Sequence, residues 1–263
     1  MCPPIDHSKR RTGVTRLSFL AGSALFVSSA LDASAHAARS DHAPVPNGSL
    51  LGPYNNAWLF TVRQADGHTR QQGIWSDHLQ FREADGRRAL LRVQGMTYVN
   101  GASSSVLNMF DPQTMLPISS QTRGPDGKTI KRTFENGRVK STNIAGPGAA
   151  EVNTDFAAEG PVYDFYGGMY GLLLATFPLG PGAEGVFRSV EEFDDAVTTA
   201  SFRVVGRERT LAGSRGLIDT WRVEANRTGK PNMTFWLSQA APYIIKLEMG
   251  NAGDAQIMSF DMI

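Results

Sequence analysis

The chain has 263 residues, of which 41% are hydrophobic and 19% charged, so it can bury a substantial core and is too apolar to be a disordered chain. Its 26 basic and 25 acidic residues leave a formal net charge of +1, which argues against nucleic acid as a partner. The single cysteine, Cys2, excludes a disulfide scaffold, a cysteine zinc site and an iron–sulfur cluster.

The N-terminal segment 1–37 has the order of regions found in a secretory signal peptide. Basic residues precede an apolar segment at 17–31, and small residues at 33–37 offer two A-x-A cleavage sites. The apolar segment is shorter than the roughly 20 residues that a membrane-spanning helix needs. We predict export to the periplasm, cleavage after Ala37 or Ala35, and no transmembrane anchor after processing. A pair of adjacent arginines leaves the twin-arginine route open, although general secretion fits better.

Residues 38–57 follow, polar and rich in proline and glycine as far as Pro53, with no hydrophobic period. This composition predicts a flexible lead-in. A single domain is expected at 58–263.

From Trp58 onward the pattern has a period of two residues, because Trp58, Phe60 and Val62 alternate with less apolar neighbours, as in half-buried strands. Five hairpin dipeptides separate the first strands: Asp66-Gly67, Asp85-Gly86, Asn100-Gly101, Asp126-Gly127 and Asn136-Gly137. Further strands are predicted at about 197–210, 217–226, 233–238, 243–249 and 256–262. The sequence therefore predicts ten to twelve antiparallel strands.

One apolar segment, 164–179, is too long for an ordinary strand. Asp164 is a plausible N-cap and Pro178 would stop a helix, so we predict a helix here. Glycine costs about 1 kcal/mol against alanine inside a helix, so Gly168 and Gly171 indicate a helix that is held by packing against another backbone. The expected fold is mainly β, a curved antiparallel sheet or half-barrel wrapped around one central helix.

Catalytic and metal-binding patterns are nearly absent from the sequence. Of the histidines after the predicted signal peptide, only His78 lies on a predicted strand, and no metal-ligand spacing occurs, so we predict neither metal nor cofactor. The segment 180–185 matches G-x-G-x-x-G but precedes a strand rather than a helix, so it is interpreted as a loop. Residues 127–129 and 212–216 are interpreted as turns, and the acidic group at 191–195 as a solvated turn.

Three segments resemble those of a family of exported bacterial proteins known as a domain of unknown function: DGKTIKRTFENGRV at 126–139, VYDFYGGMYGLLLATFPL at 162–179 and MTFWLSQAAPYIIKLEM at 233–249. That family is similar in turn to the LolA/LolB-like lipoprotein-carrier superfamily. The resemblance covers about residues 58–263. It implies a curved sheet that wraps a helical plug over an apolar cavity, and it supplies no catalytic residues.

Three functional hypotheses follow. The first is a periplasmic binding or carrier module for an apolar or lipid-like ligand, without nucleic acid as a partner. The second is a hydrolase or lyase that uses the same cavity, with Tyr163, Asp164, Tyr166 or His78 as acid or base. The third is a structural partner of an envelope protein, without ligand. For the first hypothesis the candidate ligand-lining residues are Tyr166, Met169, Tyr170, Leu173, Trp221, Phe235 and Trp236.

Overall fold

The computed structural model describes residues 45–84, 86–164, 170–190, 195–227, 230–250 and 254–263. All of them belong to one compact unit, Asp41–Ile263. The predicted signal peptide lies outside the described residues, as do Tyr166 and Met169. Among the described residues, no helix is long and apolar enough to cross a membrane.

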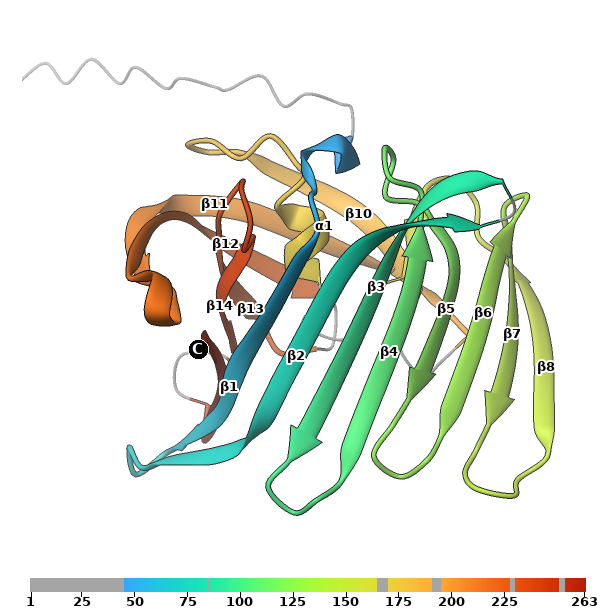
Figure 1. The fold of residues 1–263 in the computed structure, drawn as a ribbon, viewed down its shortest axis with the longest axis horizontal. Helices are drawn as coiled ribbons and strands as arrows, with labels where there is room; N and C mark the ends of the chain where they lie inside the picture. Colours follow the sequence, from blue (N-terminus) through green and yellow to red (C-terminus); the bar gives the residue numbers. More distant parts are fainter. Residues whose placement is uncertain (1–44, 85, 165–169, 191–194, 228–229, 251–253) are drawn as a thin grey trace, which may run out of the picture. The chain divides into compact units, whose positions relative to one another are not determined.

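The described residues are built almost entirely from strands (Figure 1). In chain order the elements are η1 (Gly48–Leu50), β1 (Tyr54–Gln64), β2 (Thr69–Ala84), β3 (Arg87–Tyr98), β4 (Ser103–Phe110), β5 (Pro117–Arg123), β6 (Thr129–Glu135), β7 (Arg138–Ile144), β8 (Glu151–Ala157), β9 (Val162–Tyr163), α1 (Tyr170–Leu174), β10 (Glu184–Val190), β11 (Val197–Leu211), η3 (Gly213–Arg215), β12 (Leu217–Arg227), β13 (Met233–Leu237), β14 (Ile244–Met249) and β15 (Gln256–Met262).

All fifteen strands belong to one sheet, in the order β8-β7-β6-β5-β4-β3-β2-β1-β15-β14-β13-β12-β11-β10-β9. Neighbouring strands are antiparallel except β9 and β10, which are parallel. The ladder does not close, since β8 and β9 are its two edges. The prediction of a mainly antiparallel β protein is confirmed, but the predicted ten to twelve strands are too few.

The predicted hairpin turns place glycine where the backbone needs a positive φ. Gly67, Gly86, Gly101 and Gly127 all have φ between 71° and 84°. At the β6–β7 turn both Asn136 (φ 51°) and its neighbour Gly137 (φ 72°) are left-handed, as a type I′ turn requires. These turns fix the register of the strands that they join.

The main core lies on one face of the sheet, where the period-two pattern puts the apolar side chains. Along β1, Trp58, Phe60 and Val62 are buried while the residues between them are more exposed. Trp58 stacks on Trp75 of β2, with ring centroids 4.1 Å apart. All five residues of α1 are buried against this core.

The helix differs from its prediction. Of the expected helix at 164–179, the described residues form only Tyr170–Leu174, and 165–169 lie outside the described residues. After Leu174 the chain tightens into short turns, because Thr176 and Phe177 donate their N–H groups to the carbonyls three residues earlier. The Thr176 hydroxyl also donates to the Leu173 carbonyl, at 2.6 Å. These local bonds end the helix before Pro178 is reached.

The packed chain begins before Trp58. The Asn47 N–H donates to the carbonyl of Thr176, just after α1, at 2.9 Å, and Gly48 and Leu51 are buried. The Gly48 backbone lies so close to Pro112 that a Cβ would sit 2.6 Å from its carbonyl oxygen. The residues just before β1 therefore pack against the sheet unit.

Candidate functional site

The structure brings together several of the predicted ligand-lining residues. Tyr170 and Leu173 of α1 and Phe235 of β13 are fully buried in the main core, and Trp221 is half-buried against it. Trp236 faces the opposite side of β13 from Phe235, because adjacent strand residues point to opposite faces. Whether these side chains line a ligand stays a prediction.

Trp236 makes polar contacts on its own face of the sheet. Its indole N–H donates to the Glu208 carboxylate, and the Lys246 ammonium lies 4.9 Å from the ring centroid. Trp221 has a comparable neighbour in Arg207, whose guanidinium carbon lies 5.5 Å from the ring. Both tryptophans therefore combine apolar packing with a cation at the ring.

Tyr170 is the residue of α1 that has a polar side-chain group. Its hydroxyl lies 2.7 Å from the Ser189 hydroxyl and accepts a hydrogen bond from Arg227 Nη1 at 3.2 Å. The Arg227 guanidinium also lies over the ring, at 5.0 Å. These contacts satisfy a hydroxyl that would otherwise be buried without a partner.

Among the acid–base candidates that the structure describes, His78 lies apart from Tyr163 and Asp164. His78 is exposed, on the opposite face of β2 from the buried Asp77. Asp164 is buried, and its carboxylate accepts a hydrogen bond from Ser120 on the inner face of β5. Tyr163 is also buried, and burial raises its pKa to about 12. His78 thus lies on the opposite face of the sheet from the buried Asp164.

Asp164 belongs to a buried polar group that sequence reasoning missed. At its centre Arg132 Nη1 lies 3.6 Å from Asp164 Oδ1, and Arg132 Nη2 lies 3.9 Å from Asp195 Oδ1. Asp195 also accepts hydrogen bonds from the side chains of Asn143 and Thr154. We call this group the Arg132 cluster: Asn108, Ser120, Arg132, Asn143, Thr154, Asp164 and Asp195.

The Arg132 cluster joins parts of the chain that the ladder leaves unpaired. It connects the inner face of β4–β8 to Asp164, which precedes α1, and to Asp195, which precedes β11. Beside it Val139, Ala158, Val162 and Val190 form a second apolar cluster. The two edges of the open sheet are thus linked by side chains rather than by backbone hydrogen bonds. Asp195 is part of this link, which corrects its interpretation as a solvated turn.

Burial dominates the electrostatics of Asp164. Loss of solvation raises the pKa of its carboxyl group, while the Arg132 charge and the Ser120 hydrogen bond act in the opposite direction and offset only part of the rise. A carboxylate that is costly to ionise in the folded state makes stability depend on pH.

A second buried ion pair lies on β2 and β3. Arg92 Nη2 donates to Asp77 Oδ2 at 2.6 Å and Arg92 Nε donates to the same carboxylate at 3.0 Å. The Tyr54 hydroxyl donates to Asp77 Oδ2 at 2.8 Å, and burial raises the pKa of Tyr54 well above its usual value. Both members of the ion pair are completely buried.

Methionines line the inner face at the strand ends. The register β1–β15–β14–β13 pairs Val62 with Met258, Met258 with Met249, and Met249 with Met233. The adjacent row on the same face contains Phe235, which contacts α1. Met249 and Met258 are only half-buried, so this row reaches solvent.

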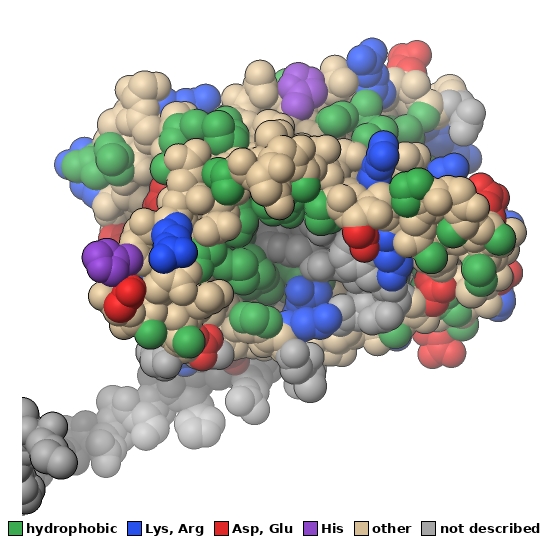
Figure 2. All heavy atoms as spheres, turned by 90° about the horizontal axis from the view of Figure 1, so that it is seen from below, with side chains coloured by type: hydrophobic (Ala, Val, Ile, Leu, Met, Phe, Trp, Pro, Cys, Tyr) green, Lys and Arg blue, Asp and Glu red, His purple; other side chains and the backbone are tan. Residues whose placement is uncertain are grey.

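Figure 2, seen from below, shows a hollow whose edge carries hydrophobic side chains and, on one side, Lys or Arg.

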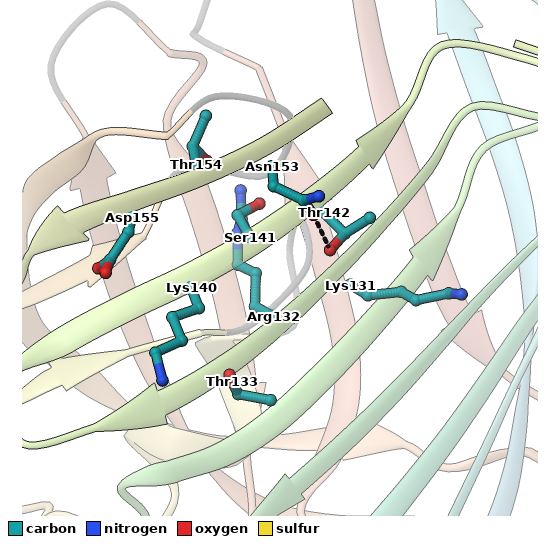
Figure 3. A pocket seen from close by; sticks show the side chains of 9 residues that line it. All are labelled: Lys131, Arg132, Thr133, Lys140, Ser141, Thr142, Asn153, Thr154 and Asp155. Carbon is teal, nitrogen blue, oxygen red and sulfur yellow. Dashed lines mark hydrogen bonds between the residues drawn. The ribbon is translucent and has the colours of Figure 1, made fainter. Parts of the chain in front are cut away.

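A pocket of different chemistry lies on β6–β8 (Figure 3). Its volume is about 470 Å³ and its lining residues are Lys131, Arg132, Thr133, Lys140, Ser141, Thr142, Asn153, Thr154 and Asp155. All nine are polar or charged. Among the residues that the structure describes, no group of three His, Cys, Asp or Glu side chains could hold a metal ion.

Comparison with known proteins finds similarity to solved structures at low sequence identity. No family model matches the chain, and no curated protein matches it. A beta-barrel-like protein of domain of unknown function DUF1849 from Brucella abortus is 11% identical, with a TM-score of 0.44 over 80% of this chain and 95% of that one. The hypothetical lipoprotein YmcC from Escherichia coli is 14% identical, with a TM-score of 0.29 over 80% of this chain and 87% of that one. The resemblance to lipoprotein carriers stays a prediction.

Proposed function

We propose that this chain is an exported binding or carrier module of the cell envelope for an apolar or lipid-like ligand. The ligand would lie on the inner face of the sheet beside α1. The observation that supports this most is the methionine row, because Met233, Met249 and Met258 continue the buried core toward a half-exposed edge.

Methionine suits such a role for a physical reason. Its side chain is unbranched and polarisable, so it fits ligands of varied shape. A row of three methionines in register on one face is more adaptable than a core of branched side chains. Tyr98 and the stacked pair Phe60–Phe260, with centroids 4.6 Å apart, extend the apolar lining next to this row.

The enzyme alternative has less support. It needs an acid and a base that face one substrate, whereas Asp164 is buried on the inner face and His78 is exposed on the outer face. The envelope-partner alternative predicts a filled interior without ligand, and binding measurements distinguish it from carriage.

The test is titration of the delipidated protein with a fluorescent fatty-acyl probe. Wild type should bind saturably, and Met249→Gln should weaken binding, because a polar amide then borders the acyl chain. Met109→Gln is the matched control, since Met109 is a half-buried methionine on the outer face of β4. Leu173→Trp is a less suitable variant, because Leu173 is fully buried and would overpack.

Carriage of an apolar ligand would be refuted by wild type that binds no acyl or isoprenoid probe. It would also be refuted by equal weakening in the Met109 and Met249 variants, which would show that the probe does not use the inner face. Thermal midpoints of both variants establish that the fold persists.

A further inference from the structure

The pocket on β6–β8 has a lining that an apolar ligand would not use. Exposed Lys131, Thr133 and Lys140 alternate with the buried Arg132 and Ser141, so the pocket opens on the solvent side of these strands. Its volume, about 470 Å³, lies within the range of small-molecule sites. This pocket is therefore distinct from the apolar interior.

The strand register determines how the side chains are arranged. Lys131 pairs with Thr142, which pairs with Asn153, and the next row pairs Thr133 with Lys140 and Lys140 with Asp155. Each row thus holds one lysine among neutral or acidic polar side chains. Figure 3 shows Lys131 and Lys140 on opposite sides of the labelled group.

The charge of this pocket is positive on balance. Asp155, its one carboxylate, is held by Arg138 Nε at 2.8 Å. Lys140 lies 3.4 Å from Glu135, but both side chains are about 60% exposed, and such surface pairs hold a lysine weakly. Lys131 takes part in none of the ion pairs formed between described residues. Two ammonium groups therefore remain for an anion.

Hydrogen-bond donors surround these cations. Thr142 donates to Asn153 Oδ1 at 2.7 Å, so the amide nitrogen is the group that Asn153 can offer to a ligand. The hydroxyl group of Thr133 is a further donor and acceptor on the same side of the strands. The lining contains no aromatic ring that could stack on a base and no apolar side chain that could hold an acyl chain.

We propose that this pocket binds a small phosphorylated polyol, with Lys131 and Lys140 reaching the phosphate from opposite sides and the Thr and Asn side chains on the polyol hydroxyls. Phosphate offers several acceptor oxygens and a charge of −1.5 to −2 at pH 7, which matches two ammonium groups with hydroxyl donors nearby. A free sugar phosphate and the glycerophosphate headgroup of a lipid share these phosphate oxygens and hydroxyl groups, although the phosphodiester of a lipid carries a single negative charge. The site is independent of the apolar interior and goes beyond the proposed function.

The experiment is calorimetric titration of the protein with glycerol 3-phosphate and glucose 6-phosphate at low salt, with glycerol and glucose as unphosphorylated controls. Only the phosphorylated compounds should bind. The double variant Lys131→Gln/Lys140→Gln should weaken binding by about tenfold or more. Exposed lysines tolerate this change, so the variant should fold, which its thermal midpoint verifies. Lys230→Gln, also exposed but outside the pocket, should bind as wild type does.

A second arm identifies the source of the phosphate. Sedimentation with phosphatidylcholine vesicles, with and without phosphatidylglycerol, measures headgroup binding. Anionic vesicles that bind wild type and release it to glycerol 3-phosphate indicate a lipid headgroup, whereas binding of the free compounds without vesicle binding indicates a soluble ligand. The proposal is overturned by no saturable phosphate binding, by full binding in the double lysine variant, or by equal loss in Lys230→Gln. The acyl-probe titration does not depend on these results, so the failure of one proposed site can be distinguished from the failure of the other.

Discussion

Gly171 of α1 offers the sharpest test of how the helix is held, because a Cβ at this position would meet two side chains of the sheet. It would lie 2.8 Å from Phe235 Cδ1 and 3.0 Å from Ile244 Cδ1 and Cγ1, closer than carbon atoms pack. The approach is made by side chains, whereas the glycine pattern had predicted a strand backbone. Alanine at 171 would gain about 1 kcal/mol of helix propensity over glycine.

Overpacking opposes that gain. Forcing a methyl group into a filled core costs about 1–3 kcal/mol, so Gly171→Ala should lower the free energy of unfolding by up to about 2 kcal/mol. Gly171→Leu should cost more, since its additional carbon atoms enter the same space. The assay is urea unfolding followed by tryptophan fluorescence, with the midpoint compared at constant slope.

A double-mutant cycle separates this clash from other effects. Ile244→Val removes Cδ1 and alone should cost about 0.5–1.5 kcal/mol. Combined with Gly171→Ala it should cost less than the sum, because the space that one change removes is the space that the other fills. The control is Gly180→Ala, where a Cβ would meet no atom within 4 Å. A Gly171→Ala variant more stable than wild type, or strict additivity with Ile244→Val, would refute the packed-helix reasoning.

Three further predictions concern buried groups. Asp77→Asn should cost about 3–5 kcal/mol in urea unfolding, because it leaves the Arg92 charge buried without its partner. Asp219→Asn, in the exposed Arg207–Asp219 pair, should cost under about 1 kcal/mol. Equal costs of the two variants would contradict this prediction. Because the pKa of Asp164 is raised, the folded state loses stability as pH rises from about 4 through that pKa. Asp164→Asn should therefore gain stability relative to wild type over this pH range. A stability difference that stays constant with pH would contradict the raised pKa of Asp164. Leu173→Ala should cost about 2–5 kcal/mol if α1 sits in a solid core, and a smaller loss would indicate a void beside it.

The sequence was most informative where one face of a strand is apolar. The predicted strands at 197–210, 217–226 and 256–262 agree with β11, β12 and β15 within a few residues. The Asp-Gly and Asn-Gly dipeptides located the turns, because few other residues adopt a positive φ without strain. Both signals are local, so a single sequence carries them.

Strands β7 and β8 have weaker patterns for a physical reason. Their inner positions include Ser141, Asn143 and Thr154, which make hydrogen bonds instead of apolar contacts. Asn143 and Thr154 bond Asp195 across the sheet opening, and Asn143 also bonds Ser141 on its own strand. Alternation of apolar and polar residues is lost when the inner face is itself polar. The strand count was therefore too low on this side of the sheet.

The buried charges also leave a signal in the sequence, because they stand at positions where the period of the strand expects an apolar residue. Asp77 lies between Trp75 and Leu79 on the apolar side of β2, and Arg132 follows Ile130 on the buried side of β6. A charged residue in an apolar register needs a partner that the fold brings close to it. The period predicts that such a partner exists, but only the folded structure identifies it.

The sheet opening is the place where the proposed carriage would be easiest to accommodate. Separating two paired strands elsewhere would break a row of backbone hydrogen bonds, whereas β8 and β9 share none in the ladder. Their side-chain link consists of the small second apolar cluster, the hydrogen bonds of Ser120 to Asp164 and of Thr154 to Asp195, and the charges around Arg132. The contacts of Arg132 to Asp164 and Asp195 are long, at 3.6 and 3.9 Å. Ion pairs at such distances hold less firmly than the 2.6 Å pair of Asp77 and Arg92. Opening the sheet between β8 and β9 would therefore break side-chain contacts but no ladder hydrogen bonds, while the long β1–β4 ladders keep the sheet intact.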